Sequence, residues 1–173
     1  MRYVVLVAMS LLGTLFSGSV FSVFTINGIQ IDIVFLLVMS LVLVEKSAMP
    51  VVFAAVTGLL MDVMYARELG IYALSYAIAA AVGSVLFRKI EKFNLLHLFA
   101  IGAVGYIFKE VVTAFIVFVQ GARFNFPLLF GVEILPAAAV NGALLLVAYL
   151  LIARLYRNAW MRPRASAHHL DEL

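Results

Sequence analysis

The sequence predicts an all-α membrane protein with six transmembrane helices, and its composition and hydropathy support this. Hydrophobic residues make up 66% of the 173 positions, only 12% are charged, and the mean hydropathy is +1.15. A soluble domain usually carries about 25% charged residues, so this chain could not cover a water-facing surface. These values exclude a soluble enzyme, a nucleic-acid-binding domain and a disordered chain. The absence of Cys excludes disulfides and thiol chemistry.

Six apolar runs are candidates for spanning helices, each of which needs about 20 apolar residues. Helices are expected because unpaired backbone groups are too costly in lipid. The runs are continuous rather than alternating, which excludes a barrel. They cover residues 3–24, 29–44, 48–65, 71–87, 95–119 and 135–156. Because only short loops separate them, residues 1–156 are expected to form one transmembrane domain, followed by a polar tail at 157–173.

The first apolar run has an alternative interpretation as a signal peptide. Arg2 would be its charged region, and Ser17, Gly18 and Ser19 would supply small residues for cleavage. A signal peptide usually has an apolar core of about 7–15 residues, whereas this run has about 20. A retained helix is therefore favoured.

The distribution of Lys and Arg predicts the orientation, because cytoplasmic loops carry an excess of both. With six spans, only Arg67 and Arg123 lie on one side, and Lys109 lies within a span. The other nine lie on the opposite side together with both termini, which are therefore expected in the cytoplasm. These nine are Arg2, Lys46, Arg88, Lys89, Lys92, Arg154, Arg157, Arg162 and Arg164.

Two connections and one proline have a recognisable local pattern. Residues 24–31 alternate around Asn27 and Gly28, a pair that suits a two-residue turn. This turn is either a lip over a cleft or a plain tight connection, and the plain connection is favoured. Residues 124–131 are expected at the outer interface, before Pro136 opens the last helix.

Small residues at four-residue spacing predict where helices touch. Ala54 with Gly58, and Ala79 with Gly83, have this spacing, which lets helix backbones approach closely in lipid. Ala73, Ala77 and Ala81 form a third such set. These faces serve either packing within the bundle or a partner helix, and internal packing is favoured.

Five ionisable residues lie within or beside the predicted spans: Asp32, Asp62, Lys109, Glu110 and Glu133. A charge at the centre of a span costs about 2.5–3.5 kcal/mol on insertion scales. Neighbouring helical residues do not face each other, so Lys109 and Glu110 are each expected to pair elsewhere. Glu110 either completes the network or faces a partner helix. Asp62 is the first candidate for the lysine and Asp32 the second.

This cluster has three interpretations: a polar cavity, a catalytic pair, or an ion-pair clamp that fixes helix register. The clamp is favoured. No catalytic residue, metal site or cofactor is expected. His168 and His169 in the tail are adjacent and form a weak ligand set, so a solvated tail near anionic headgroups is the favoured interpretation there.

Three stretches resemble the MreD family of bacterial rod shape-determining membrane proteins. They read I-D-I-V-F-L-L-V at 31–38, G-L-L-M-D-V at 58–63 and L-G-I-Y-A-L at 69–74. The family typically has an Asp that opens the second helix, a G-L-x-x-D near the end of the third, and an L-G start to the fourth. Asp32, Gly58, Asp62, Leu69 and Gly70 match these positions, while Ile31 stands where the family often has Pro.

The resemblance implies a non-enzymatic scaffold of the cell-elongation complex in the bacterial inner membrane. Such a scaffold helps maintain cell shape by organising lateral peptidoglycan synthesis. Its protein partners would be the single-span periplasmic protein MreC, the glycosyltransferase RodA with its penicillin-binding transpeptidase, and the actin-like MreB. It would also contact membrane lipids, and no nucleic acid is expected to bind. The family is also similar in fold to the substrate-binding subunits of energy-coupling-factor vitamin transporters.

That similarity supplies one alternative function, a vitamin-binding subunit of a transporter. Such subunits often carry an A-x-x-x-A face on the first helix, where this chain has only Gly13 with Ser17 and Thr14 with Gly18. Lys109 alone among the polar groups of the outer half would suit an anionic vitamin.

A second alternative is an intramembrane aspartyl peptidase, in which Asp32 and Asp62 would share a proton. Lipoprotein signal peptidases of this kind carry an N-x-x-D signature. No Asn of this sequence is followed three residues later by Asp. The scaffold is therefore favoured.

Topology reporters test the predicted orientation. A reporter that is active only in the cytoplasm should be active when fused after Glu172 and silent when inserted beside Arg67, because nine positive residues mark the terminal side as cytoplasmic. The reverse pattern would contradict the six-span topology.

Overall fold

A computed structural model describes residues 2–23, 29–65, 69–88, 90, 93–123 and 125–157. Every element in these ranges is a helix, as the hydropathy predicts. The expected turn at Asn27 and Gly28 and the tail beyond residue 157 lie outside the described residues. The helices are α1 (Arg2–Val23), α2 (Ile33–Val44), α3 (Met49–Tyr65), α4 (Ile71–Phe87), α5 (Leu95–Val119), α6 (Phe126–Leu128), the π-helix η1 (Leu129–Ile134) and α7 (Leu135–Tyr156).

The helix boundaries follow the apolar runs closely. Helices α4 and α5 have the predicted bounds, α1 differs from its run by one residue at each end, and α3 differs by one residue at its start. Helix α2 begins at Ile33 rather than at residue 29, because Asp32 caps it. In the described part of the chain, two helices are long and apolar enough to cross a membrane, Leu95–Val119 and Phe126–Tyr156, and the other apolar helices are shorter.

Helix α7 has the predicted bounds, with Pro136 in its first turn. Helical backbone precedes it, however, because α6 and η1 lead into α7 as one continuous run of 31 residues from Phe126. In η1 the Leu135 N–H donates to the Phe130 carbonyl, five residues back. Proline removes a hydrogen bond to the carbonyl four residues back, and local π turns can satisfy the backbone groups around it. Pro136 therefore lies where the π-helix η1 gives way to α7.

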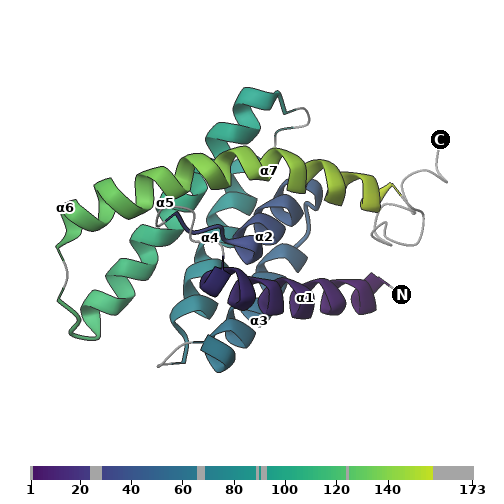
Figure 1. Ribbon diagram of the computed structural model, residues 1–173. Coiled ribbons are helices and arrows are strands. Elements are labelled where there is room, and N and C mark those ends of the chain that lie inside the picture. Colours follow the sequence, from purple (N-terminus) through teal and green to yellow (C-terminus); the bar gives the residue numbers. More distant parts are fainter. Residues whose placement is uncertain are drawn as a thin grey trace, which may run out of the picture.

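Helix α2 forms the centre of the bundle. Nine of its twelve residues are buried, and it contacts α1, α3, α4, α5 and α7. Figure 1 shows α2 in the middle of the molecule, with the start of α1 and the end of α7 on the same side. A helix that is apolar on every face is expected to be surrounded by protein, and IVFLLVMSLVLV is such a sequence.

Glycines let the surrounding helices approach closely in pairs. A Cβ atom on Gly58 of α3 would lie 2.5 Å from the Cα of Ala73 in α4. A Cβ on Gly102 of α5 would lie 2.8 Å from the Cα of Gly142 in α7. Ala54 is also fully buried. The internal packing predicted from the spacing of Ala54 and Gly58 is confirmed.

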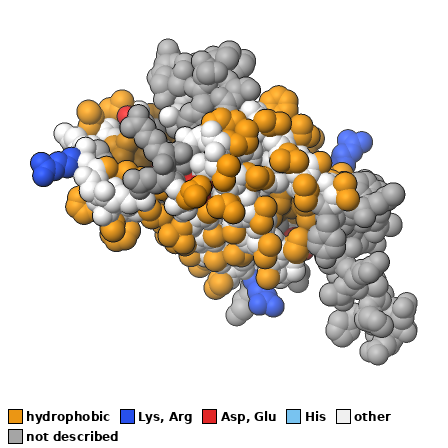
Figure 2. All heavy atoms as spheres, turned by 90° about the horizontal axis from the view of Figure 1, so that it is seen from below, with side chains coloured by type: hydrophobic (Ala, Val, Ile, Leu, Met, Phe, Trp, Pro, Cys, Tyr) orange, Lys and Arg blue, Asp and Glu red, His pale blue; other side chains and the backbone are white. Residues whose placement is uncertain are grey.

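The outside of the bundle is largely apolar. Figure 2 shows one face covered mostly by hydrophobic side chains, with Lys and Arg at its margins. Exposed residues on α3, α4 and α7 include Leu59, Val63, Val85, Leu150 and Leu151. Soluble monomers rarely expose contiguous apolar patches above a few hundred Å². This surface is typical of a helical bundle in lipid.

The α3–α4 contact can be tested at Gly58. Gly58→Ala should lower the free energy of unfolding by about 1–3 kcal/mol, the usual effect of overpacking, because the new Cβ would overlap the backbone of Ala73. Thermal unfolding in detergent measures the effect. Gly131→Ala is the matched control, since its Cβ would meet no atom within 4 Å. Equal stability of the two variants would contradict the close approach.

Candidate functional site

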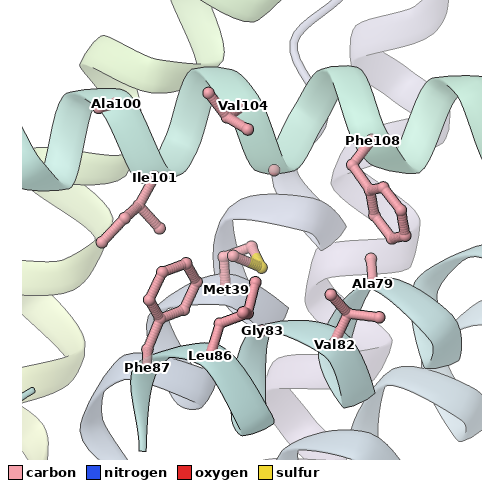
Figure 3. Close-up of a pocket in the computed structure, with 11 residues that line it drawn as sticks. Met39, Ala79, Val82, Gly83, Leu86, Phe87, Ala100, Ile101, Val104 and Phe108 are labelled. Atoms are coloured by element: carbon pink, nitrogen blue, oxygen red, sulfur yellow. The ribbon is translucent and has the colours of Figure 1, made fainter. Parts of the chain in front are cut away.

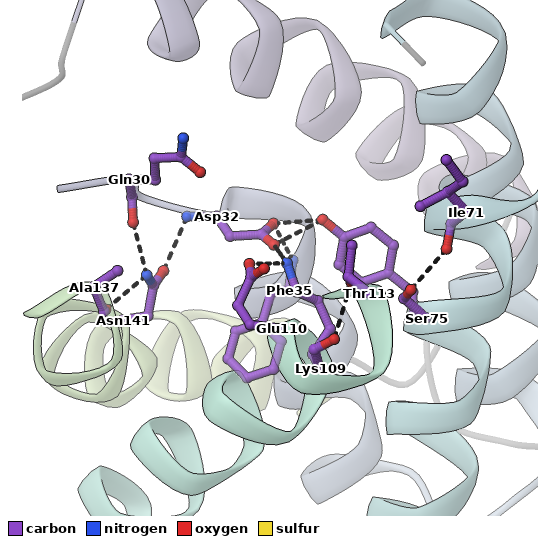
Figure 4. A network of polar contacts seen from close by, with 11 residues as sticks. Gln30, Asp32, Phe35, Ile71, Ser75, Lys109, Glu110, Thr113, Ala137 and Asn141 are labelled. Atoms are coloured by element: carbon purple, nitrogen blue, oxygen red, sulfur yellow. Dashed lines mark hydrogen bonds and ion pairs between the residues drawn. The ribbon is translucent and has the colours of Figure 1, made fainter. Parts of the chain in front are cut away.

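Asp32 is the centre of a buried polar network that joins α2, α4 and α5 (Figure 4). Its side chain caps α2, since Oδ1 accepts the Phe35 N–H at 2.8 Å. The Tyr76 hydroxyl of α4 donates to the same carboxylate, 2.7 Å from Oδ2 and 2.9 Å from Oδ1. Lys109 Nζ of α5 donates to Oδ2 at 2.9 Å. One carboxylate thus receives donors from three helices.

Lys109 is enclosed by two carboxylates and two aromatic rings. Its side chain is 3% exposed, and Nζ lies 2.9 Å from Asp32 Oδ2 and 2.6 Å from Glu110 Oε1. The ammonium also lies 5.2 Å from the ring centroid of Tyr76 and 5.1 Å from that of Tyr106. Both distances suit a cation–π interaction. The surroundings therefore offer the buried cation several favourable partners.

The expectation that Lys109 and Glu110 each pair elsewhere is wrong, and the alternative that Glu110 completes the network is confirmed. Their Cβ atoms point in different directions from the helix, as neighbouring residues must. The lysine stem is long enough for its ammonium to reach the glutamate carboxylate, at 2.6 Å. Attraction between opposite charges is strong where water is scarce. Glu110 remains 22% exposed, so it forms the more accessible edge of the network.

Asn141 extends the network to α7. The Asp32 N–H donates to Asn141 Oδ1 at 2.9 Å. The Asn141 amide in turn donates to the carbonyls of Gln30 and Ala137, both at 2.9 Å. Asn141 is completely buried, and side-chain amides are known to join helices across apolar interfaces. Neither this residue nor Tyr76 was predicted from the sequence, although an amide within an apolar helix was an available signal.

Asp62 does not pair with Lys109, contrary to the first expectation. Its oxygens accept three backbone N–H groups at the start of α4, from Gly70 at 3.0 Å, Tyr72 at 2.8 Å and Ala73 at 2.9 Å. The first N–H groups of a helix have no partner within the helix, and a carboxylate there is also favoured by the helix dipole. In the described part of the chain, no hydrogen bond joins Asp62 to Asp32.

The other motif residues support this cap. Gly70 has a φ of +103°, which favours glycine, and Gly58 gives α3 its close approach to α4. Leu69, in contrast, is 71% exposed. Of the family positions, Asp62, Gly58 and Gly70 therefore have a structural role in the α3–α4 connection.

Glu133 lies apart from the cluster in which it was expected. It is on η1 and exposed. Among the hydrogen bonds and ion pairs of the described residues, none involves Glu133. Of the five expected cluster residues, the structure brings together only Asp32, Lys109 and Glu110.

A second buried carboxylate, Glu45, holds the other end of α2. It follows α2 directly and is 3% exposed. The Tyr156 hydroxyl at the end of α7 donates to it at 2.7 Å, and the Ser47 hydroxyl also donates to it. Polar contacts therefore tie α2 to α7 at both ends. Glu45 was not predicted from the sequence.

The described residues suit structural contacts more than ligand chemistry. No group of three or more His, Asp or Glu side chains in these ranges could hold a metal ion. The tail histidines His168 and His169 lie outside the described residues. Asp32 and Lys109 instead use their hydrogen-bonding groups on each other and on neighbouring helices. Such an arrangement can fix the relative positions of four helices.

Comparison with known proteins gives one match. The family model of the rod shape-determining protein MreD matches residues 1–159. No curated protein and no solved structure matched the chain. Because the match covers nearly the whole sequence, the chain belongs to the MreD family of membrane proteins, and its role is in determining rod shape.

The ion pair can be tested at Lys109. Lys109→Met should lower stability by about 3–5 kcal/mol, the usual effect of removing one partner of a buried pair, because Asp32 and Glu110 would keep their charges without the cation. Abundance in membranes and thermal unfolding in detergent measure the effect.

The rescue pattern identifies the partner of the lysine. The double variant Lys109→Met with Asp32→Asn should recover part of the stability, since Asn can still accept from Phe35 and Tyr76. Lys109→Met with Asp62→Asn is the control and should recover none, because Asp62 bonds to the α4 backbone. Full stability of Lys109→Met, or rescue by the control, would contradict the geometry.

Proposed function

We propose that this MreD-family chain is a non-enzymatic, multi-pass scaffold of the bacterial inner membrane. It helps organise lateral peptidoglycan synthesis by holding proteins of the cell-elongation complex in place. The observation that carries the proposal is the use of the buried charges. Asp32 accepts hydrogen bonds from side chains of α4 and α5, one of them Lys109. Asp62 accepts from the backbone at the start of α4. A rigid bundle of this kind suits a protein that positions others.

In this proposal all six apolar helices, α1 to α5 and the continuous helix that ends in α7, cross the membrane, and both termini are cytoplasmic. Helix α2 has twelve residues and is about 18 Å long at 1.5 Å per residue, which is shorter than the apolar core of a bilayer. Because five other helices surround it, little of it needs to contact lipid. Residues 157–173 form a polar cytoplasmic tail.

The partners follow from the family. They are MreC, RodA with its penicillin-binding transpeptidase, and the actin-like MreB on the cytoplasmic side. The exposed apolar surfaces of α3, α4 and α7 offer area for single-span or multi-span partners in the membrane. The similarity in fold to the substrate-binding subunits of energy-coupling-factor transporters is part of the same proposal.

The two alternative functions find less support. Lys109, the group suited to an anionic vitamin, already donates to Asp32 and lies in contact with Glu110. Asp32 and Asp62, the two aspartates of a peptidase dyad, accept from different sets of donors. The scaffold is the function that these contacts favour.

Depletion tests the proposal in a rod-shaped host. Cells that lose this protein should become round while still dividing, because elongation fails and division does not depend on it. The stable variant Gly131→Ala should restore rod shape as fully as the native chain does. Depleted cells that stay rod-shaped but require an added vitamin would contradict the scaffold and favour the transporter subunit.

Crosslinking from native membranes tests the partner set directly. Affinity capture of the crosslinked chain should recover MreC and RodA. Capture of the Lys109→Met variant, compared at equal membrane abundance, should recover less MreC and less RodA if the bundle geometry positions these partners. Capture without either partner would contradict the proposal.

A further inference from the structure

An apolar groove runs between α4 and α5 (Figure 3). Its volume is about 370 Å³, and its lining is entirely hydrophobic residues and glycine. Val82 and Leu86 of α4 form one wall, and Val104 and Phe108 of α5 form the other. Met39 of the central helix lies at the base, where it is 2% exposed.

The groove is a hollow between two exposed walls, with a buried side chain at its base. Its walls are open to the outside, with Leu86 62% and Val104 65% exposed, above the buried Met39. Gly105 keeps the base clear, since a Cβ there would lie 3.2 Å from Met39 Cε. A flexible hydrocarbon chain can follow this hollow between the two helices, because it is lined only by apolar side chains and glycine.

Positively charged residues follow α4 at one end of the groove. Phe87 lines the groove and ends α4, and the next residue, Arg88, is exposed. The same connection carries Lys89 and Lys92 in sequence, against one acidic residue, Glu91.

Other exposed cations lie at this end of the bundle. Gly83 near the end of α4 lies close to Val42 near the end of α2. The end of α2 is joined in turn to the end of α7 through Glu45 and Tyr156. Exposed cations at these helix ends are Lys46, Arg88, Arg154 and Arg157.

We infer that the α4–α5 groove binds an acyl chain of an anionic phospholipid whose phosphate contacts Arg88. Lipid tails are as apolar as the groove, so the tail alone supplies little selectivity. Selectivity comes from the headgroup, because basic sites beside membrane helices attract anionic lipids on the cytoplasmic side. This inference rests on the proposed placement of α4 and α5 across the membrane.

Native mass spectrometry of the full chain can test the inference. The detergent-extracted protein is mixed with equal amounts of phosphatidylglycerol and phosphatidylcholine that carry the same acyl chains. The first bound lipid should be mainly phosphatidylglycerol. Arg88→Gln should lower this preference about fivefold, the effect expected for one basic residue near the headgroup. Arg123→Gln, an exposed arginine on the α5–α6 connection, is the charge control and should leave it unchanged.

A second pair of variants tests the groove itself. Val104→Trp should reduce the first bound lipid at least severalfold, because the indole would narrow the groove. Val147→Trp is the matched control, since Val147 is 56% exposed on α7 and does not line this groove.

Several results would overturn the inference. These are equal binding of the two lipids by the native chain, an equal effect of Arg123→Gln and Arg88→Gln, or no difference between the two Trp variants. Crosslinking of position 104 to a partner helix, unaffected by added lipid, would do the same. If the native chain shows no lipid preference but still restores rod shape, the groove proposal is wrong and the scaffold proposal stands.

Discussion

The burial of Lys109 against Asp32 is the constraint on which the arrangement of the other helices depends. A buried charge is tolerated only with a close partner and further hydrogen bonds. Here these come from α2, α4 and α5 through Asp32, Tyr76 and Lys109, and Asn141 adds α7. Apolar packing has no direction of its own, and most of α2 is apolar on every face. The polar contacts at Asp32 and Glu45 therefore set the depth and rotation of the central helix.

Hydropathy predicts the helices well because each apolar run in this chain is one helix with few polar interruptions. The apolarity of residues 33–44 on every face was a signal for a central helix, but it was not used. The helical backbone before the last apolar run was not predicted. A proline usually marks a first turn, but the backbone before Pro136 stays helical by adopting a π turn in η1. The residues that decide this lie upstream, in a stretch that contains Gly131 and Glu133 and has a weaker helical pattern.

The site was only partly predictable, because position along a helix does not reveal which helices are neighbours. Asp32 and Lys109 were recognisable as costly residues inside apolar runs, yet their pairing depended on α2 and α5 meeting at that depth. Asp62 was assigned to the lysine because the free N–H groups at the start of α4 were not considered as its partners. Tyr76 was not singled out within its apolar run, although its hydroxyl needs a buried acceptor. Glu110 was misjudged because backbone direction was given more weight than side-chain length.

Hydrogen–deuterium exchange in Lys109→Met protein tests the central role of the ion pair most directly. If the pair holds the start of α2, amides of residues 29–36 should exchange markedly faster than in the native chain. Amides of residues 70–73 should keep their protection, because Asp62 accepts from three of them without help from Lys109. Unchanged protection at residues 29–36, or an equal loss throughout all helices, would contradict the role assigned to this interaction.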